Sequence, residues 1–398
     1  MNARELFLKH QSQITESPIG IEISHAKGIY IFDKKGKKYI DLVAGVSACT
    51  LGHSNKQILK SINTQLKKYT HVMVYGEYIQ DPQINLAIKL AENLPRKLNC
   101  SYFVNSGTEA IEGAIKLAKR TTNKSEIIFC KNSYHGSTQG SLSYMGNEER
   151  KSNYRPLLPD GKMIRFNSIE DLKFITNNTA AIIIELIQSG SGFKVASKEW
   201  VKKIKEKCQQ FNTILIFDEI QTCFGRTGKL FGFQKYNVTP DILCIAKGMG
   251  GGMPIGCFIS STKMMQNFQK NPALGHITTF GGHPINCIAS LKTLEILNKS
   301  NTIDQITKKE KLFRKLLSHK EILNISGLGL MLGVKFKNEK MCDLVIKQCR
   351  KNGLLAFYFL FEKKSMRISP PLTITEKEIK KSCEIIIKSI NDCLESLS

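Results

Sequence analysis

Residues 217–256 read FDEIQTCFGRTGKLFGFQKYNVTPDILCIAKGMGGGMPIG, and this stretch decides the fold. Two short apolar runs accompany it: TILIFD at 213–218, which leads into it, and DILCIA at 241–246, which lies within it. Apolar runs of roughly four to eight residues bounded by turn residues are typical of buried β-strands. The first run ends at Asp218, and the second is followed at once by Lys247. Each predicted strand therefore has a chemically reactive side chain at its carboxyl end.

Similar apolar runs lie on both sides of this stretch. They alternate with segments such as 109–120 and 198–211, in which apolar side chains recur at helical spacing. Near-continuous apolar strands separated by helices predict an α/β fold, with a mainly parallel sheet covered on both faces. The expected strands are SYFV (101–104), EIIFC (126–130), AIIIEL (181–186), TILIFD (213–218), DILCIA (241–246) and GCFIS (256–260).

The two ends of the chain have a different pattern. Residues 21–42 resemble an antiparallel hairpin, with turn residues from Asp33 to Gly36. After about residue 285 we expect a long helix, strands near 330–336 and 354–361, and a terminal helix from Glu376. The simplest arrangement is a large domain of residues 54–285 and a small α+β domain formed by residues 1–53 and 286–398.

The net charge of +24 is the most unusual number in the composition. A strongly basic surface is typical of proteins that bind nucleic acids or anionic membranes. Here, however, the lysines are spread along the whole chain, and in predicted helices they follow the polar face, as in KEWVKKIKEK at 198–207. We therefore expect neither a nucleic-acid partner nor a membrane partner.

The expected cellular location and the expected lack of a metal site rest on sequence patterns that the chain does not have. No stretch approaches the roughly 18 uninterrupted apolar residues of a membrane span, and the N-terminal segment has no apolar signal core. We therefore expect a cytoplasmic protein. The twelve cysteines include no CxxC pair and none of the spacings of zinc sites, so we expect neither a disulfide framework nor a metal.

Three features at predicted strand ends carry chemistry, because ligands of open parallel sheets bind at the carboxyl ends of the strands. Lys247 lies between an apolar strand and a glycine-rich turn, where partial desolvation lowers the pKa of an amine and makes it nucleophilic. The Ser-Gly-Thr turn at 106–108 starts a helix and suits a phosphate, although a plain helix cap has the same pattern. Asp218 is a carboxylate at a strand end, and by itself it is also compatible with capping the next turn.

A lysine, a phosphate cup and a strand-end carboxylate are together the parts that pyridoxal-5′-phosphate (PLP) chemistry needs. On these residues the sequence resembles the class III aminotransferases of PLP fold type I, the group of ornithine, acetylornithine, 4-aminobutyrate and diaminopelargonate aminotransferases. The resemblance runs from GIYIFDKKGKKYIDL (28–42) through LGH (51–53) to RISPPLTIT (367–375), and residues 217–256 are its most specific part. It implies a seven-stranded, mainly parallel sheet in the large domain and PLP as the cofactor.

The resemblance also implies roles for individual residues. Lys247 would carry the cofactor as a Schiff base and move protons, Asp218 would pair with the pyridine nitrogen, and Tyr134 would stack on the ring; these are the expected catalytic residues. Gln221 would hydrogen-bond the phenolic oxygen of the ring. The other expected cofactor contacts are Ser106, Gly107, Thr108 and, from the second subunit of a homodimer, Thr279.

Substrate recognition is implied by three further positions. Glu185 and Arg367 match a glutamate and a switchable arginine, which leaves its partner to bind the α-carboxylate of glutamate or 2-oxoglutarate; a permanent structural ion pair is the alternative. Ser137 stands where ornithine and acetylornithine enzymes place an arginine for the distal carboxylate, so the amino donor stays open. Two smaller departures from the family pattern are Leu186 for a proline and His283 for an asparagine.

We therefore expect ping-pong transfer of an amino group between an amine or ω-amino acid of the ornithine or acetylornithine type and 2-oxoglutarate. Two alternatives stay open. An aminomutase of the glutamate-1-semialdehyde type would use the same scaffold, although the presence of both Glu185 and Arg367 argues against it. A basic binding protein on a decayed enzyme scaffold would show broken catalytic positions, whereas Asp218, Gln221 and Lys247 are all present.

Overall fold

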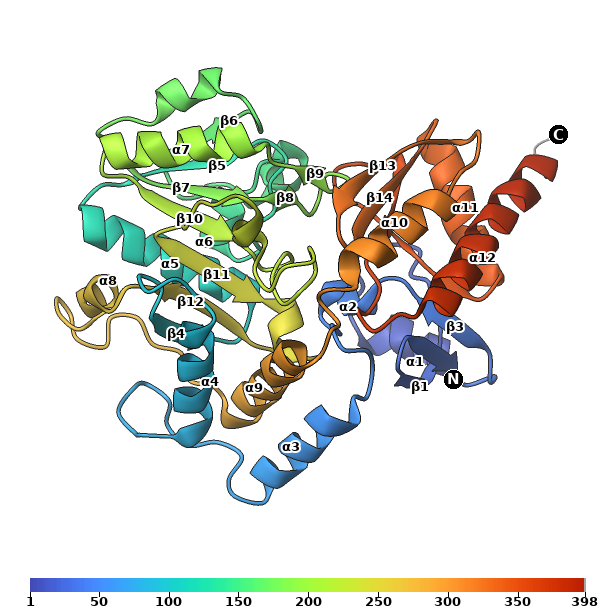
Figure 1. Ribbon diagram of the computed structural model, residues 1–398, viewed down its shortest axis with the longest axis horizontal. Helices are drawn as coiled ribbons and strands as arrows, with labels where there is room; N and C mark the ends of the chain where they lie inside the picture. The colour runs from blue at the N-terminus through green and yellow to red at the C-terminus, as the bar shows by residue number, and fades with distance from the viewer. Residues whose placement is uncertain (397–398) are drawn as a thin grey trace.

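The computed structural model describes residues 1–396. In Figure 1 the chain forms two bodies side by side. The body on the left holds the largest sheet and the middle of the chain, and the body on the right holds both termini. No helix in the described part of the chain combines the length and the apolar character that crossing a membrane requires.

The largest sheet has seven strands in the order β4-β12-β11-β10-β7-β5-β6. Neighbouring strands run parallel, except that β12 is antiparallel to both β11 and β4. The predicted α/β class and mainly parallel seven-stranded sheet are thereby confirmed. The strands are β4 (Cys100–Val104), β5 (Glu126–Cys130), β6 (Gly161–Ile164), β7 (Thr179–Glu185), β10 (Ile214–Asp218), β11 (Ile242–Ala246) and β12 (Gly256–Ser260).

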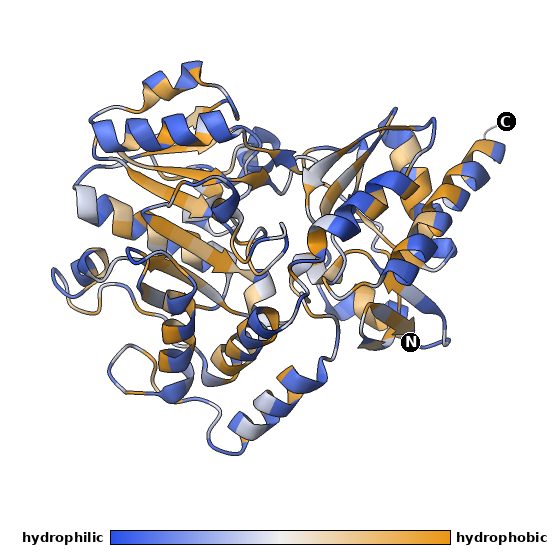
Figure 2. Cartoon of the chain, in the orientation of Figure 1, coloured by the Kyte–Doolittle hydropathy of each residue, from blue (hydrophilic) through white to orange (hydrophobic). Residues whose placement is uncertain are grey.

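Helices cover both faces of this sheet because its central strands are apolar on both sides. Successive residues of a strand point to opposite faces. On β7, Ile182 belongs to one core cluster together with Trp200 of α7 (Lys198–Gln210). Its neighbour Ile183 belongs to a second cluster that includes the buried side of α5 (Gly107–Thr122). Figure 2 shows the result, with apolar strands inside and polar outer faces on the helices.

The second body is built around two four-stranded sheets, β1-β2-β3-β15 and β13-β14-β17-β16. Both ends of the chain meet here, because β15 pairs in parallel with β3. Helix α12 packs against α10 and α11, and α11 also contacts β14 and β17. The elements are β1 (Ile23–Lys27), β2 (Tyr30–Asp33), β3 (Lys38–Asp41), β13 (Ile322–Leu328), β14 (Met331–Phe336), β15 (Leu354–Leu355), β16 (Phe357–Tyr358), β17 (Ser365–Ile368), α10 (Ile306–Leu316), α11 (Glu339–Lys351) and α12 (Glu376–Glu395).

The long helix α9 (Pro284–Lys299) packs against α3 (Lys56–Leu66) and α4 (Asp81–Glu92). It spans the proposed boundary at residue 285, and the division into domains of residues 54–285 and of residues 1–53 with 286–398 stays a proposal. The remaining elements are short or peripheral: α1 (Ala3–His10), α2 (Ala44–Ser47), α6 (Gln139–Ser143), α8 (Thr262–Met265), β8 (Ile187–Gln188) and β9 (Lys194–Val195).

The six predicted strands of the large sheet are all present, within two residues of their expected ends. The sequence does not predict β6, whose GKMI segment lies at the edge of the sheet and is mostly exposed. It also misses β13, where polar residues and a glycine interrupt the apolar pattern of ILNISGL. The predicted turn from Asp33 to Gly36 joins β2 to β3, but the segment is a three-stranded meander and not a single hairpin.

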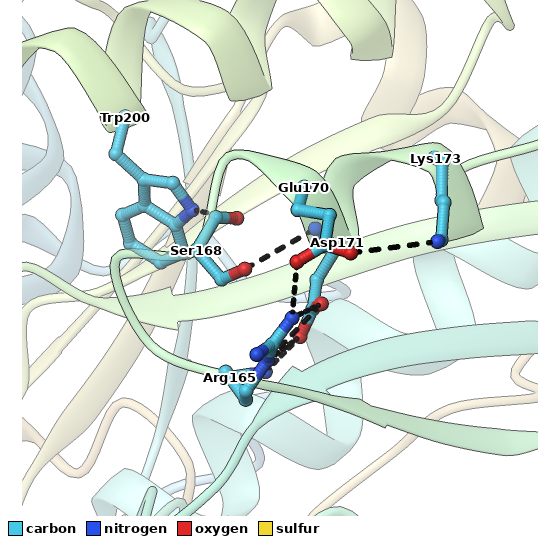
Figure 3. A network of polar contacts seen from close by, with 6 residues as sticks. All are labelled: Arg165, Ser168, Glu170, Asp171, Lys173 and Trp200. Carbon is cyan, nitrogen blue, oxygen red and sulfur yellow. Dashed lines mark hydrogen bonds and ion pairs between the residues drawn. The ribbon is translucent and has the colours of Figure 1, made fainter.

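A polar network fastens the segment after β6 to α7 (Figure 3). Arg165 donates hydrogen bonds to the Asp171 carboxylate from its backbone N–H (2.7 Å) and from its guanidinium (2.6 Å). These hydrogen bonds hold the pKa of Asp171 well below its usual range. The carbonyl of Ser168, in the same turn, accepts a hydrogen bond from the indole of Trp200 (3.1 Å). The network thus ties the segment after an edge strand to the buried face of α7.

Replacing Asp171 with asparagine is expected to lower the free energy of unfolding at neutral pH. Because the folded-state pKa of Asp171 is depressed, its stabilisation is present above the ordinary aspartate pKa of about 4 and is lost as the pH falls below that value. Urea unfolding of wild type and Asp171→Asn at neutral pH and at about pH 2 measures the difference, because most of the stabilisation is still present at about pH 4. Glu170→Gln is the control, since Glu170 contacts the same arginine from a largely exposed position. Equal losses in both variants contradict a special role for Asp171.

Candidate active site

A cavity of about 630 Å³ opens at the carboxyl ends of the central strands of the large sheet. This volume is in the range of pockets that bind small ligands and cofactors. Strands β7 and β10 end there at Glu185 and Asp218, and Lys247 follows β11 directly. Nine of the eleven predicted site residues line this one cavity, namely Ser106, Gly107, Thr108, Tyr134, Ser137, Glu185, Asp218, Gln221 and Lys247.

Lys247 has a strained backbone and a perturbed amine. Its φ of 45° lies in the left-handed region, which residues other than glycine adopt only when the surrounding structure enforces it. Burial, together with the positive charge of Arg367, lowers the pKa of the Lys247 amine. A lower pKa increases the fraction of neutral, nucleophilic amine near neutral pH. The lysine is therefore chemically prepared to attack a carbonyl group in the cavity.

Asp218 is held by a buried histidine that the sequence analysis did not single out. Asp218 Oδ2 lies 2.7 Å from Nδ1 of His135, and Asp218 Oδ1 accepts a hydrogen bond from the N–H of Ile220 (3.0 Å). Burial opposes a charged imidazole, but the hydrogen bond and the charge of Asp218 outweigh it and raise the pKa of His135. The sequence offered one signal for this contact, a histidine next to Tyr134 in the loop expected at the cavity. That position alone did not show that His135 bonds to Asp218.

The start of α5 forms another wall of the cavity. Ser106 caps the helix, because its Oγ accepts a hydrogen bond from the N–H of Glu109 (3.3 Å). The N–H groups of the first helical turn lack partners within the helix and carry the positive end of its dipole. The Thr108 hydroxyl lies 2.6 Å from that of Ser141, and a Cβ on Gly136 would collide with it. Glycine at 136 therefore lets the backbone approach this anion-binding helix start.

Glu185 and Arg367 do not form the direct ion pair that the sequence predicts. Among residues 1–396 no nitrogen of Arg367 lies within 4.0 Å of a Glu185 oxygen. The Glu185 carboxylate instead accepts hydrogen bonds from the backbone N–H groups of Tyr134 (2.9 Å) and Ser189 (2.8 Å), and burial raises its pKa. In this structure backbone donors hold the Glu185 carboxylate, and the expected direct ion pair with Arg367 is absent.

Arg367 is held mainly by aromatic rings. Its guanidinium carbon lies 5.2 Å from the ring centroid of Phe193 and 4.9 Å from that of Phe359, a geometry in which a ring attracts a cation. One nitrogen donates to the carbonyl of Ser189 (2.7 Å), while Nε is buried without a hydrogen-bond partner. Burial lowers the pKa of Arg367 to about 10, although the charge of Glu185 acts in the opposite direction. The cation lies behind the cavity wall and does not line the cavity.

Comparison with known proteins places this geometry in one family. Residues 12–390 match the family model described as Aminotransferase class-III. The chain is 37% identical to the acetylornithine aminotransferase of Clostridium acetobutylicum over 391 residues, which cover 94% of this chain and 98% of that protein. It is 38% identical to the acetylornithine aminotransferase of Methanocaldococcus jannaschii over 371 residues, 90% of each chain. The chain belongs to the class III aminotransferases.

A solved structure agrees with this family. The ornithine aminotransferase from Toxoplasma gondii ME49 aligns with a TM-score of 0.90 at 27% identity, covering 98% of this chain and 95% of that one. This class III aminotransferase therefore has PLP fold type I, and it is a PLP-dependent enzyme. The predicted family, fold, enzyme class and cofactor are confirmed. The roles of the individual residues stay predictions.

The cavity of this aminotransferase fits PLP on its own geometry. The start of α5 suits the phosphate, and the Lys247 amine suits the aldehyde carbon. Gln221 lines the cavity, and its Oε1 is buried without a hydrogen-bond partner. Buried polar atoms nearly always have partners, so an orphaned amide atom at a cavity wall indicates that a ligand completes the site.

Two predicted residues lie outside the cavity of the single chain. Arg367 is behind the wall, as described above. Thr279 is exposed on the segment between β12 and α9. Its neighbour Thr278 lines a second hollow, together with Tyr78 and Ile84. A contact between Thr279 and a cofactor phosphate would therefore have to be made to a second copy of the chain.

Lys247→Ala is expected to abolish covalent retention of PLP. After reduction with borohydride, mass spectrometry of wild-type peptides should find the cofactor on Lys247, whereas the variant should show no reduced adduct and an activity lower by at least about a thousandfold. Lys229→Ala is the control, because Lys229 is exposed in the same stretch of sequence. An adduct on another lysine in the wild-type enzyme would contradict the assignment.

Proposed function

We propose that this enzyme moves an amino group from a primary amine or ω-amino acid to 2-oxoglutarate by a ping-pong mechanism. The donor would leave as an aldehyde or ketone in the first half-reaction, and glutamate would leave in the second. The observation that supports this best is a lysine of lowered pKa in one cavity with Asp218 and close to a buried cation, Arg367. When bound, PLP supplies an electron sink and a carrier for the nitrogen.

Lys247 is the residue that we propose to move protons. Its neutral Nζ would take the proton from the carbon that bears the amino group and return a proton when the carbonyl product forms. The lowered pKa of Lys247 favours the neutral form needed for the first step. Tyr134, on the cavity wall, would exclude water from one face of the bound ring.

Asp218 and His135 would act as a fixed pair. The raised pKa of His135 favours its charged form beside the Asp218 carboxylate, and two hydrogen bonds hold that carboxylate in one orientation. An oriented, buried carboxylate is suited to hold a proton on a ring nitrogen placed against it. His135 acts through Asp218 and is therefore a positioning residue.

Arg367 would bind the α-carboxylate of glutamate or 2-oxoglutarate. It needs no release from a salt bridge, since the aromatic rings of Phe193 and Phe359 and one carbonyl hold it. The carbonyl belongs to Ser189, which lines the cavity, so a small movement of this side chain would bring the guanidinium to the substrate. The unpartnered Nε gives it spare capacity for a bidentate contact.

The other end of the amino donor would meet an uncharged surface. Lys247 is the sole lysine or arginine among the described residues that line the cavity. Ser137 is hydrogen-bonded to the hydroxyl of Tyr134 (3.0 Å), and Met253 and Ile187 provide apolar contacts nearby. A donor whose distal group is neutral therefore fits better than one with a distal carboxylate.

A panel of amines with 2-oxoglutarate tests this function. Glutamate formation should be faster with donors whose distal group is neutral than with N-acetylornithine. Ser137→Arg should raise kcat/KM for the carboxylate-bearing donor relative to the neutral one by about tenfold or more, because it adds a charge-assisted hydrogen bond. Ser137→Ala is the control, since it removes the contact with Tyr134 without adding a charge. Absence of glutamate formation with every donor contradicts the transaminase proposal.

The active unit is proposed to be a homodimer. Exposed apolar side chains gather on α4 and on the segments before α4 and α9, around the hollow next to Thr279; they include Tyr78, Ile79, Ile84, Ile88, Ile277 and Phe280. A large exposed apolar patch is typical of a subunit interface.

A cytoplasmic location is likewise proposed, and twelve free thiols in the described chain support it.

Phe280→Asp is expected to convert the dimer to a monomer and to weaken PLP retention, because a charge would be buried in the interface and Thr279 would be lost from the neighbouring site. Sedimentation velocity at several protein concentrations measures the first effect, and equilibrium dialysis of PLP measures the second. Leu323→Asp, at a similarly exposed apolar position on β13, is the control. A monomeric wild-type enzyme with full activity would overturn the proposal.

A further inference from the structure

A left-handed turn at residues 44–47 stands beside the cavity. Four consecutive residues there have positive φ: Ala44 (52°), Gly45 (58°), Val46 (59°) and Ser47 (68°). L-residues with a side chain are strained in this conformation, so a run of this kind persists only where other contacts enforce it.

Both parts of the chain that meet in the small body hold this turn. Asp41, at the end of β3, accepts hydrogen bonds from the N–H groups of Val43 (2.8 Å) and Ala44 (3.0 Å). Ser369, just after β17, donates its N–H to the Leu42 carbonyl (2.7 Å) and its hydroxyl to the Val43 carbonyl (3.4 Å). Contacts from Asp41 and Ser369 therefore fix the strained backbone, and they give its last residue, Ser47, a defined position.

That residue, Ser47, is buried against Gln221. The amide Nε2 of Gln221 lies 2.9 Å from the Ser47 hydroxyl. Gln221 lines the cavity, and its Oε1 is buried without a hydrogen-bond partner. The oxygen and nitrogen of a glutamine amide exchange places by a half-turn of the side chain. A serine hydroxyl accepts from the nitrogen in one orientation and donates to the oxygen in the other. Ser47 is the hydrogen-bond partner of this amide in either case.

We propose that Ser47 is a positioning residue whose hydroxyl donates to Gln221 Oε1 in the loaded enzyme and so turns the Gln221 N–H toward the phenolic oxygen of the pyridoxal ring. The inference rests on the proposed role of Gln221. An anionic oxygen needs a donor and would be repelled by Oε1, which selects the orientation with the N–H outward. Ser47 then holds the Gln221 N–H in place. The strength of the hydrogen bond from Gln221 in turn affects how tightly the ring oxygen holds the proton that it shares with the lysine nitrogen.

Ser47→Ala removes the hydroxyl and tests the inference by the colour of the bound cofactor. In a pH titration of the absorbance of purified enzyme, the midpoint should move upward by on the order of one pH unit, because a ring oxygen without its donor holds the shared proton more tightly. Ser47→Gly is a second variant. It also lacks the hydroxyl but relieves the backbone strain at this position, so it guards against a folding defect.

Two further variants separate the possible failures. Gln221→Leu should give the same upward shift, and Ser47→Ala should add nothing in the Gln221→Leu background, as expected for residues that act as one unit. Ser369→Ala removes only the hydroxyl contact with the Val43 carbonyl and keeps the backbone hydrogen bond to Leu42, so the turn should hold and the midpoint should stay in place. No shift in Gln221→Leu overturns the role of Gln221 itself. A shift in Gln221→Leu but in neither Ser47 variant, or an equal shift in Ser369→Ala, overturns the role of Ser47.

Discussion

Two carboxylates lie buried side by side at the ends of neighbouring strands, and the other polar groups of the site are arranged around them. Strands β7 and β10 pair in parallel with Glu185 directly beside Asp218. Like charges at this spacing oppose each other, and the charge of Asp218 contributes to the raised pKa of Glu185. Basic side chains from three elements surround this pair: His135 bonded to Asp218, Lys247 after β11, and Arg367 on β17. Sheet register thus decides the charge balance of the cavity, since a slip of one residue between β7 and β10 would turn one of the two carboxylates to the other face.

The sequence predicted the parts of the site that depend on local pattern. The strands at 214–218 and 242–246 are apolar on both faces, so their ends, and with them Asp218 and Lys247, were easy to locate. The Ser-Gly-Thr turn was recognisable because capping chemistry is local. The edge strand β6 has no such pattern and was missed.

Contacts between distant segments were beyond the same reasoning. The hydrogen bond between His135 and Asp218 joins residues far apart in the chain, and the sequence around either residue does not indicate the other. The aromatic setting of Arg367 needs Phe193 from one part of the sequence and Phe359 from another, so the predicted ion pair with Glu185 was the natural but wrong choice. The left-handed turn at 44–47 depends on contacts made by Ser369, which no local propensity contains.

Arg367, on β17, comes later in the chain than all the residues that line the cavity. A polypeptide synthesised only as far as β12 already contains every residue that lines the cavity. It lacks β17, which carries Arg367, and the segment that fixes the turn at 44–47 from its second side. Chain order thus places every residue of the cavity lining before the strand that holds the buried cation behind its wall.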